Sequence, residues 1–100
     1  MKRESFAEKC YSLLRQVPQG KVTTYKALAQ ALGTKAYLAV GNAMNRNPYA
    51  PRVPCHRVIA TDGSLGGFAF GVRKKKGMLL KEGVEIVKGK IDLTKYGHFF

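Results

Sequence analysis

Breaker residues divide the first half of this chain into three segments with helical spacing, and this division restricts the possible folds more than any other feature. Ser5 and Glu8 have the spacing of a capping box, so a first helix is expected to start there and to stop at Pro18-Gln19-Gly20. Its apolar side chains recur on one face: Phe6, Cys10, Leu13, Leu14 and Val17. That spacing predicts that Cys10 belongs to the core.

The next two segments predict a helix-turn-helix. Thr23 or Thr24 can cap a second helix, and Gly33 marks its C-terminal end. Thr34 is then expected to cap a third helix, from about residue 35 to residue 46. Two short helices joined around a glycine form a helix-turn-helix, which is a common pattern and by itself only weakly specific.

The third helix has an apolar inward face and a mostly small outward face. The inward residues are Ala36, Val40, Ala43 and Met44, and the outward ones are Leu38, Gly41, Asn42 and Asn45. Small residues let a helix approach another surface closely. This suits the narrow minor groove of DNA better than the long side chains that read base edges in the major groove.

The second half of the chain predicts a strand element and one more helix. The apolar run Val58-Ile59-Ala60 precedes the turn signal Asp62-Gly63, which favours a small β-hairpin. Residues 72–82 have helical character, and Gly83 would end that helix. In the tail, residues 84–100, Val84, Ile86 and Lys88 alternate like a strand, Lys88-Gly89-Lys90 is a candidate turn, and the aromatic end either packs back or frays. The expected fold class is α+β: a mainly helical single domain over residues 1–100, with a winged-helix-like helix-turn-helix as its DNA-binding element.

The charge balance favours a polyanionic partner. The 100 residues include 18 Lys and Arg against 6 Asp and Glu, a formal net charge of +12. Such a charge attracts nucleic acid and makes binding depend steeply on salt, although it suits RNA or an anionic membrane surface as well as DNA. No apolar run approaches the ~20 residues that a membrane span needs, so no membrane partner is expected.

The two cysteines are too few for a disulfide scaffold, and the N-terminus has no signal-peptide pattern. The protein is therefore expected in the cytoplasm, or in the nucleus of a eukaryote. Cys10, Cys55, His56 and His98 lack the paired spacing of zinc ligands, so no metal site is expected.

The segment Pro54-Cys55-His56-Arg57-Val58 places a thiol directly before a histidine and close to positive charge. Only the thiolate of a cysteine is nucleophilic, and a neighbouring cation or base lowers the pKa of a cysteine from its usual value of about 8.5. The prolines of the preceding loop restrict the backbone, which would hold the sulfur in one orientation. The alternative is that Cys55 is a small buried apolar residue, as most single cysteines are.

That pentapeptide is the active-site signature of the O6-alkylguanine-DNA alkyltransferases, the methylated-DNA–protein-cysteine methyltransferases, and the chain resembles their C-terminal active-site domain from Phe6 to about Gly83. The other family motifs recur in the same order: Gly20-Lys21-Val22-Thr23-Thr24-Tyr25, Ala39-Val40-Gly41-Asn42-Ala43-Met44, Asn47-Pro48 and Leu79-Leu80-Lys81-Glu82-Gly83. The resemblance implies a DNA-repair enzyme that needs no cofactor and transfers an alkyl group irreversibly to its own cysteine.

The resemblance also implies a role for each matching residue. Cys55 would be the nucleophile, His56 would act as its base through a water molecule, and Glu82 would hold the other ring nitrogen of His56. Tyr25 would protonate the leaving guanine, and Asn47 would connect the recognition helix to the active-site loop. Taken singly, Glu82 could equally be a helix-end residue, Tyr25 a core residue and Asn47 a helix stop.

The implied partner is double-stranded DNA containing O6-alkylguanine, bound by a monomer that rotates the damaged nucleotide out of the duplex. The residues expected at the DNA are Thr24, Tyr37, Leu38, Gly41, Asn42, Asn45 and Arg46. Those expected around the extruded base are Pro54, Val58, Gly67, Phe68, Ala69 and Phe70. Arg57 is expected to hold the active-site loop.

Two positions depart from the family pattern. Leu38 stands where the family usually has the arginine that fills the place of the rotated base, and we expect leucine to act as an apolar wedge there. Phe68-Ala69-Phe70 replaces Tyr-Ser-Gly, so the pocket loses two hydroxyls, and Phe70 should narrow the space beside the alkyl group.

The sequence alone leaves three questions open. The chain could be an alkyltransferase-like lesion sensor, although such proteins carry tryptophan or alanine where this chain has Cys55. It could also be a plain helix-turn-helix regulator. The family's N-terminal domain is missing from these residues, and the sequence does not distinguish a minimal protein from one module of a fusion with another DNA-repair domain.

Overall fold

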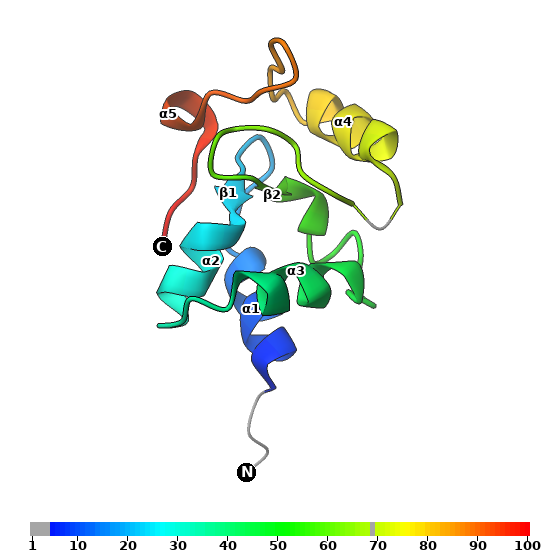
Figure 1. Cartoon of the computed structure of the whole chain (residues 1–100). Coiled ribbons are helices and arrows are strands. Elements are labelled where there is room, and N and C mark those ends of the chain that lie inside the picture. The colour runs from blue at the N-terminus through cyan, green and yellow to red at the C-terminus, as the bar shows by residue number, and fades with distance from the viewer. Residues whose placement is uncertain (1–4, 69) are drawn as a thin grey trace.

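Two short strands divide the fold into an N-terminal and a C-terminal half. The computed structural model describes residues 5–68 and 70–100. Its helices are α1 (Phe6–Leu14), α2 (Tyr25–Ala31), α3 (Tyr37–Asn45), α4 (Val72–Lys81) and α5 (Leu93–Tyr96), and its strands are β1 (Thr23–Thr24) and β2 (Val58–Ile59), with one 3₁₀ turn, η1 (Cys55–Arg57). Figure 1 shows the strands between α1, α2 and α3 on one side and α4 and α5 on the other.

The strands separate two apolar clusters. Successive strand residues point to opposite faces, so Val58 packs with the first three helices while Ile59 packs against Leu79 of α4. The first cluster also contains Cys10, which is fully buried as predicted. The mainly helical architecture with a small strand element is confirmed.

The predicted β-hairpin is wrong. β2 pairs in parallel with β1, with Thr23 opposite Val58, instead of folding back on its own continuation. The turn signal does form a turn, because the Ser64 N–H donates to Asp62 Oδ1 at 2.9 Å, but Ser64 then makes an isolated bridge to Lys90 in the tail. Both residues of β2 are buried, so burial between the two halves governs its pairing more than the adjacent turn does.

Two of the three predicted helix caps are confirmed. Ser5 Oγ accepts from the Glu8 N–H, and Thr24 Oγ1 accepts from the Ala27 N–H. The third prediction is wrong, because Thr34 Oγ1 accepts from the Ala36 N–H one residue before α3 begins. The later start also leaves Ala36 exposed instead of inward.

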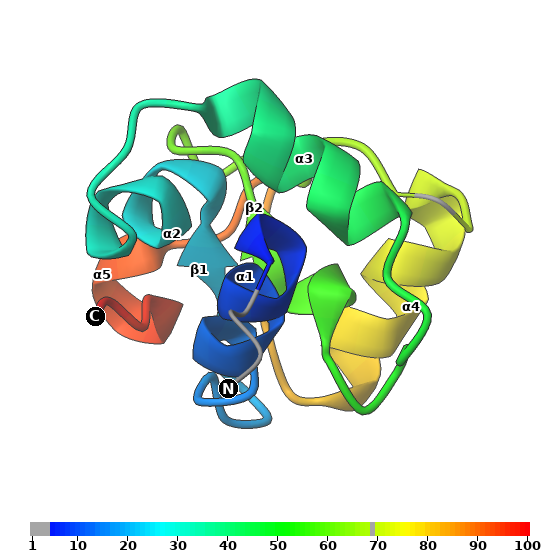
Figure 2. The same ribbon diagram turned by 90° about the horizontal axis from the view of Figure 1, so that it is seen from below.

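The remaining residues of α3 lie as predicted. Val40, Ala43 and Met44 are buried, whereas Leu38 is 79% exposed. Figure 2 shows α3 crossing the molecule between α2 and α4, with the loop that follows α3 running past α4 before it reaches η1. This path brings the segment that contains Cys55 against α4.

The aromatic end of the tail packs back instead of fraying, and it pairs with Val22, the residue before β1. The Val22 N–H donates to the carbonyl of Tyr96, and the His98 N–H donates to the carbonyl of Val22. Gly83 has a φ of +89° and ends α4 as predicted. Glu82 is therefore held at the C-terminal end of that helix.

Candidate active site

Cys55 begins the single turn η1 and is almost enclosed. It is 5% exposed and His56 is 2% exposed. The Cys55 N–H donates to the carbonyl of Val53 at 2.9 Å, and the Arg57 N–H donates to the carbonyl of Pro54 at 2.9 Å. These bonds fix the backbone on both sides of the sulfur.

Asn47 links the end of α3 to the same turn. Its Nδ2 donates to the carbonyl of Val53 at 2.8 Å, and its Oδ1 accepts from the Tyr49 N–H at 2.9 Å. The Val53 carbonyl therefore receives both the Asn47 side chain and the Cys55 N–H. A shift of α3 would be transmitted to Cys55 through this one acceptor.

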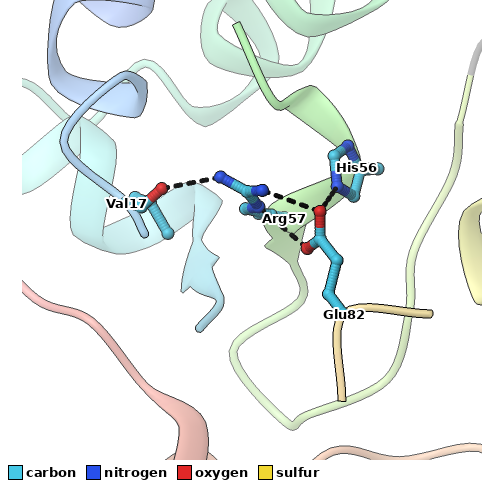
Figure 3. A network of polar contacts seen from close by, with 4 residues as sticks. All are labelled: Val17, His56, Arg57 and Glu82. Carbon is cyan, nitrogen blue, oxygen red and sulfur yellow. Dashed lines mark hydrogen bonds and ion pairs between the residues drawn. The ribbon is translucent and has the colours of Figure 1, made fainter. Parts of the chain in front are cut away.

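Glu82 joins the two residues that follow Cys55 (Figure 3). His56 Nε2 donates to Glu82 Oε2 at 2.9 Å, while Arg57 donates from Nη2 to Oε2 at 2.7 Å and from Nε to Oε1 at 2.9 Å. Arg57 Nη1 also donates to the carbonyl of Val17 at 2.9 Å. Arg57 thus connects η1 to the end of α4 and to the turn after α1.

The charges of this network favour a neutral imidazole beside a carboxylate. Burial lowers the pKa of His56 below its usual value, and the Glu82 carboxylate only partly opposes that effect. Burial would raise the pKa of Glu82, but the hydrogen bonds from Arg57 and His56 hold it below its usual value. Since Nε2 donates to Glu82, Nδ1 is the ring nitrogen left to accept a proton.

Tyr25 contacts the loop that leads to Phe68. Its hydroxyl donates to the carbonyl of Gly67 at 3.4 Å, a long hydrogen bond. Burial raises the pKa of Tyr25, and negative charge on Cys55 raises it further. The phenol therefore stays protonated at neutral pH and can donate a proton.

Lys75 is a residue of this region that the sequence analysis did not identify. It is fully buried, and its Nζ donates to the carbonyls of Val58 and Gly67 at 2.6 and 3.0 Å. The sequence carried one signal for it, since Lys75 lies four residues before the buried Leu79 and so faces the core.

A pocket of about 220 Å³ opens over Cys55 and His56. Its lining consists of Ala50, Pro51, Cys55, His56, Phe68, Phe70, Lys74 and Met78. The walls are mostly apolar, and Phe68 and Phe70 meet edge to face with ring centroids 5.4 Å apart. A flat aromatic guest fits such a lining.

The predicted pocket residues agree only in part with this lining. Phe68 and Phe70 line the pocket, but Pro54 and Val58 are buried and do not line it, and Gly67 contributes a carbonyl to Tyr25 and Lys75 instead. Ala69 lies outside the described residues. Ala50, Pro51, Lys74 and Met78 were missed because the folded loop and helix bring them in from separate segments.

The predicted DNA surface lies on the outer side of α3. Tyr37, Leu38, Asn42, Asn45 and Arg46 are exposed there, and Gly41 is partly exposed. Thr24 does not belong to this surface, because it is 3% exposed and its hydroxyl caps α2. None of the six acidic residues of the chain lies in α3.

Within residues 5–68 and 70–100, no group of three or more His, Cys, Asp and Glu side chains is gathered as metal ligands would be. The same part of the chain has no helix with the length and apolar character of a membrane span.

Comparison with known proteins identifies relatives of this chain. Residues 5–84 match the family model described as 6-O-methylguanine DNA methyltransferase, DNA binding domain. A bifunctional methyltransferase/endonuclease of Picrophilus torridus is 49% identical over 87 residues, which are 86% of this chain and 29% of that protein. A methylated-DNA–protein-cysteine methyltransferase of Saccharolobus islandicus is 43% identical over 86 residues, which are 86% of this chain and 56% of that protein. The chain thus spans less than two thirds of these relatives.

A solved structure resembles almost the entire chain. It is that of S. pombe Atl1 in complex with damaged DNA containing O6-carboxymethylguanine, with a TM-score of 0.82, 32% identity and coverage of 96% of each chain.

Proposed function

Because the chain belongs to the 6-O-methylguanine DNA methyltransferase family, we propose that it repairs O6-alkylguanine in duplex DNA by moving the alkyl group onto its own Cys55 sulfur. The observation that carries this proposal is that Cys55 lines a pocket directly beside a histidine that a mostly buried carboxylate orients. A thiol in that setting is suited to nucleophilic attack.

The reaction is a displacement at the alkyl carbon. The damaged nucleotide rotates out of the duplex into the pocket, because no side chain can reach the back of that carbon inside the stack. The sulfur–carbon bond forms while the carbon–O6 bond breaks, and the electron pair of the broken bond stays on the guanine. The products are a thioether at Cys55 and unmodified guanine.

The proton leaves the thiol through His56. Neutral His56 has Nδ1 available as acceptor, reached through a water molecule, and Glu82 stabilises the imidazolium that forms. Tyr25 supplies a proton to the guanine ring as the alkyl group departs. Its long bond to the Gly67 carbonyl is weak enough to be exchanged for one to the base.

Leu38 is proposed to wedge the duplex open from the exposed face of α3. Leu38→Ala is expected to lower both the affinity for lesion DNA and the repair rate by about tenfold, since an apolar wedge compensates for the unstacking of bases. Fluorescence anisotropy and single-turnover kinetics measure the two quantities. Val87→Ala, at an exposed apolar residue of the tail, is the matched control. Unchanged affinity and rate in Leu38→Ala would refute the wedge.

Phe70 is proposed to limit the size of the adduct. The chain should repair O6-methylguanine quickly and O6-benzylguanine slowly, because the ring of Phe70 occupies one wall of the pocket. Phe70→Gly should raise the rate on the benzyl adduct by about tenfold or more while leaving the methyl rate nearly unchanged. Equal single-turnover rates on both adducts in the native protein would contradict this assignment.

A lesion sensor that binds without transfer is the second candidate function. It is favoured by the likeness to Atl1, which extends over 96% of both chains. The presence of Cys55, and the Cys55–His56–Glu82 arrangement around it, supports transfer instead.

One experiment distinguishes these functions and a plain DNA binder. The protein is incubated with a duplex that carries a single O6-methylguanine, and its intact mass and its affinity for damaged and undamaged duplexes are measured. A gain of one methyl group indicates transfer. Selective binding without a gain in mass indicates a sensor, and equal affinity for both duplexes indicates a plain binder.

A further inference from the structure

A lysine side chain, that of Lys74, forms part of the wall of the pocket over Cys55. Lys74 lies in α4 four residues before Met78, so the two side chains share one face of the helix, and both line the pocket. The Lys74 ammonium group lies 5.4 Å from the ring centroid of Phe70, another lining residue. This wall of the pocket therefore combines apolar surface with a positive charge.

The ammonium group of Lys74 is available to a ligand. Lys74 is exposed, and it takes part in none of the ion pairs formed within residues 5–68 and 70–100. No carboxylate of that part of the chain lines the pocket, and Glu82, which is bonded to His56, is already paired with Arg57. The next lysine, Lys75, is buried and donates to two backbone carbonyls. Among the described residues, the charge of Lys74 thus has no anionic partner.

The geometry of a displacement brings the substituents of the reacting carbon to the pocket walls. The sulfur of Cys55, the carbon and the guanine O6 have to lie on one line, so the other groups on that carbon point sideways. A methyl group presents only hydrogen atoms to the walls, whereas a larger alkyl group extends toward one of them. Phe70 and Met78 offer such a group apolar contact, and Lys74 offers it a charge-assisted hydrogen bond.

An acidic substituent is the kind that Lys74 can recognise. A carboxylate on the reacting carbon is repelled by the Cys55 thiolate, because like charges at short range in a mostly apolar pocket oppose the attack. A lysine ammonium in the wall offsets this repulsion by pairing with the carboxylate. The substituent also has to be small, since the ring of Phe70 occupies part of the same wall.

We propose that the substrates of this protein include small anionic adducts, of which O6-carboxymethylguanine is the simplest, and that Lys74 determines this specificity. The inference rests on the proposed function. The Cys55 sulfur bonds to the methylene carbon of the adduct while the carbon–O6 bond breaks, and the electron pair of that bond stays on the guanine, which takes up a proton. The products are a carboxymethyl thioether at Cys55 and unmodified guanine.

The test compares two adducts that differ in charge but hardly in size, O6-carboxymethylguanine and its neutral amide, O6-carbamoylmethylguanine. Intact mass gives the single-turnover rate on each adduct for the native protein, Lys74→Met, Lys74→Glu and the exposed control Lys76→Met, and thermal unfolding shows that each variant is folded. Lys74→Met should lower the ratio of the acidic to the neutral rate by about fivefold, as for the loss of a partly exposed ion pair. Lys74→Glu should lower this ratio further, and Lys76→Met should keep the native ratio.

A second readout needs no transfer. In a Cys55→Ser background, fluorescence anisotropy gives the affinity for duplexes with either adduct and for undamaged duplex, and Lys74→Met should lower the acidic-to-neutral affinity ratio by about fivefold. If this ratio falls but the native protein transfers neither of these adducts nor a methyl group, the proposed function fails while the specificity stands. Rate and affinity ratios that stay at their native values in folded Lys74→Met would overturn the inference. An equal loss of affinity for all three duplexes would also overturn it, because Lys74 would then contact the DNA backbone instead of the adduct.

Discussion

Replacing Cys55 with serine is expected to abolish alkyl transfer while lesion binding persists. A serine hydroxyl has the same shape as the thiol but is far less nucleophilic, because it does not ionise near neutral pH. The outer face of α3 and the other residues that line the pocket are unchanged by the substitution, so the damaged nucleotide should still enter. Intact-mass measurement should detect no methylated protein, and anisotropy should give an affinity within about threefold of the native value.

Cys10→Ala is the matched control, since it removes the other thiol of the chain. Cys10 is fully buried in the core and does not line the pocket. This variant should lose some stability but transfer methyl groups at the native rate below its melting temperature. Transfer by Cys55→Ser, or its loss in folded Cys10→Ala, would show that another group accepts the alkyl group.

Substituting Glu82 with glutamine should affect stability and reactivity together. The variant leaves Arg57 without its carboxylate and weakens the orientation of His56. Removing one partner from a mostly buried ion pair costs about 3–5 kcal/mol, and the partial exposure of this one places the expected loss at the lower end of that range. Loss of the oriented base should slow transfer by about 10²-fold or more. Urea unfolding and single-turnover kinetics measure the two effects.

The pH dependence of the free energy of unfolding provides a further test of the His56–Glu82 pair. Both His56 and Glu82 have pKa values below their usual 6.5 and 4.5, so the unfolded chain binds more protons than the folded one. Native stability should therefore fall as the pH drops below about 6.5 and fall further below about 4.5. Glu82→Gln should show a smaller second decrease, because Asp62, whose pKa the hydrogen bonds from Ser64 lower, would still contribute to it.

Glu85→Gln is the control for this substitution, because Glu85 is exposed and lies 3.9 Å from the equally exposed Lys95. It should change stability little. If Glu82→Gln were as stable and as reactive as Glu85→Gln, the Glu82 network would have no role in holding the site.

Local signals allowed much of the fold to be predicted, and non-local pairing explains what was missed. Ser5 and Thr24 cap their helices with their own side chains, and such bonds within three residues can be inferred from sequence spacing. The pairing of Val58 with Thr23 spans 35 residues and depends on burial between two halves of the molecule. The nearby turn signal therefore predicted the wrong partner for this strand.

The candidate site also contains some residues that local sequence predicts and others that only the folded structure brings together. The Cys55-His56 pair is contiguous in sequence, and its chemistry could be predicted from residue types alone. Lys75 could not be separated from Lys74 and Lys76 by composition, and only its helical position relative to Leu79 indicates burial. Met78 reaches the pocket because α4 packs against η1. No local sequence pattern predicts this packing.

The central claim is that the alkyl group of the lesion ends on one sulfur atom. It is tested most directly by incubating the native protein with a duplex whose O6-methylguanine carries a deuterated methyl group, followed by digestion and peptide mass spectrometry. The account predicts one deuterated methyl group on the peptide that contains Cys55, matched by an equal amount of restored guanine in the DNA. A label that stays in the DNA, or that is found on a peptide without Cys55, would contradict it.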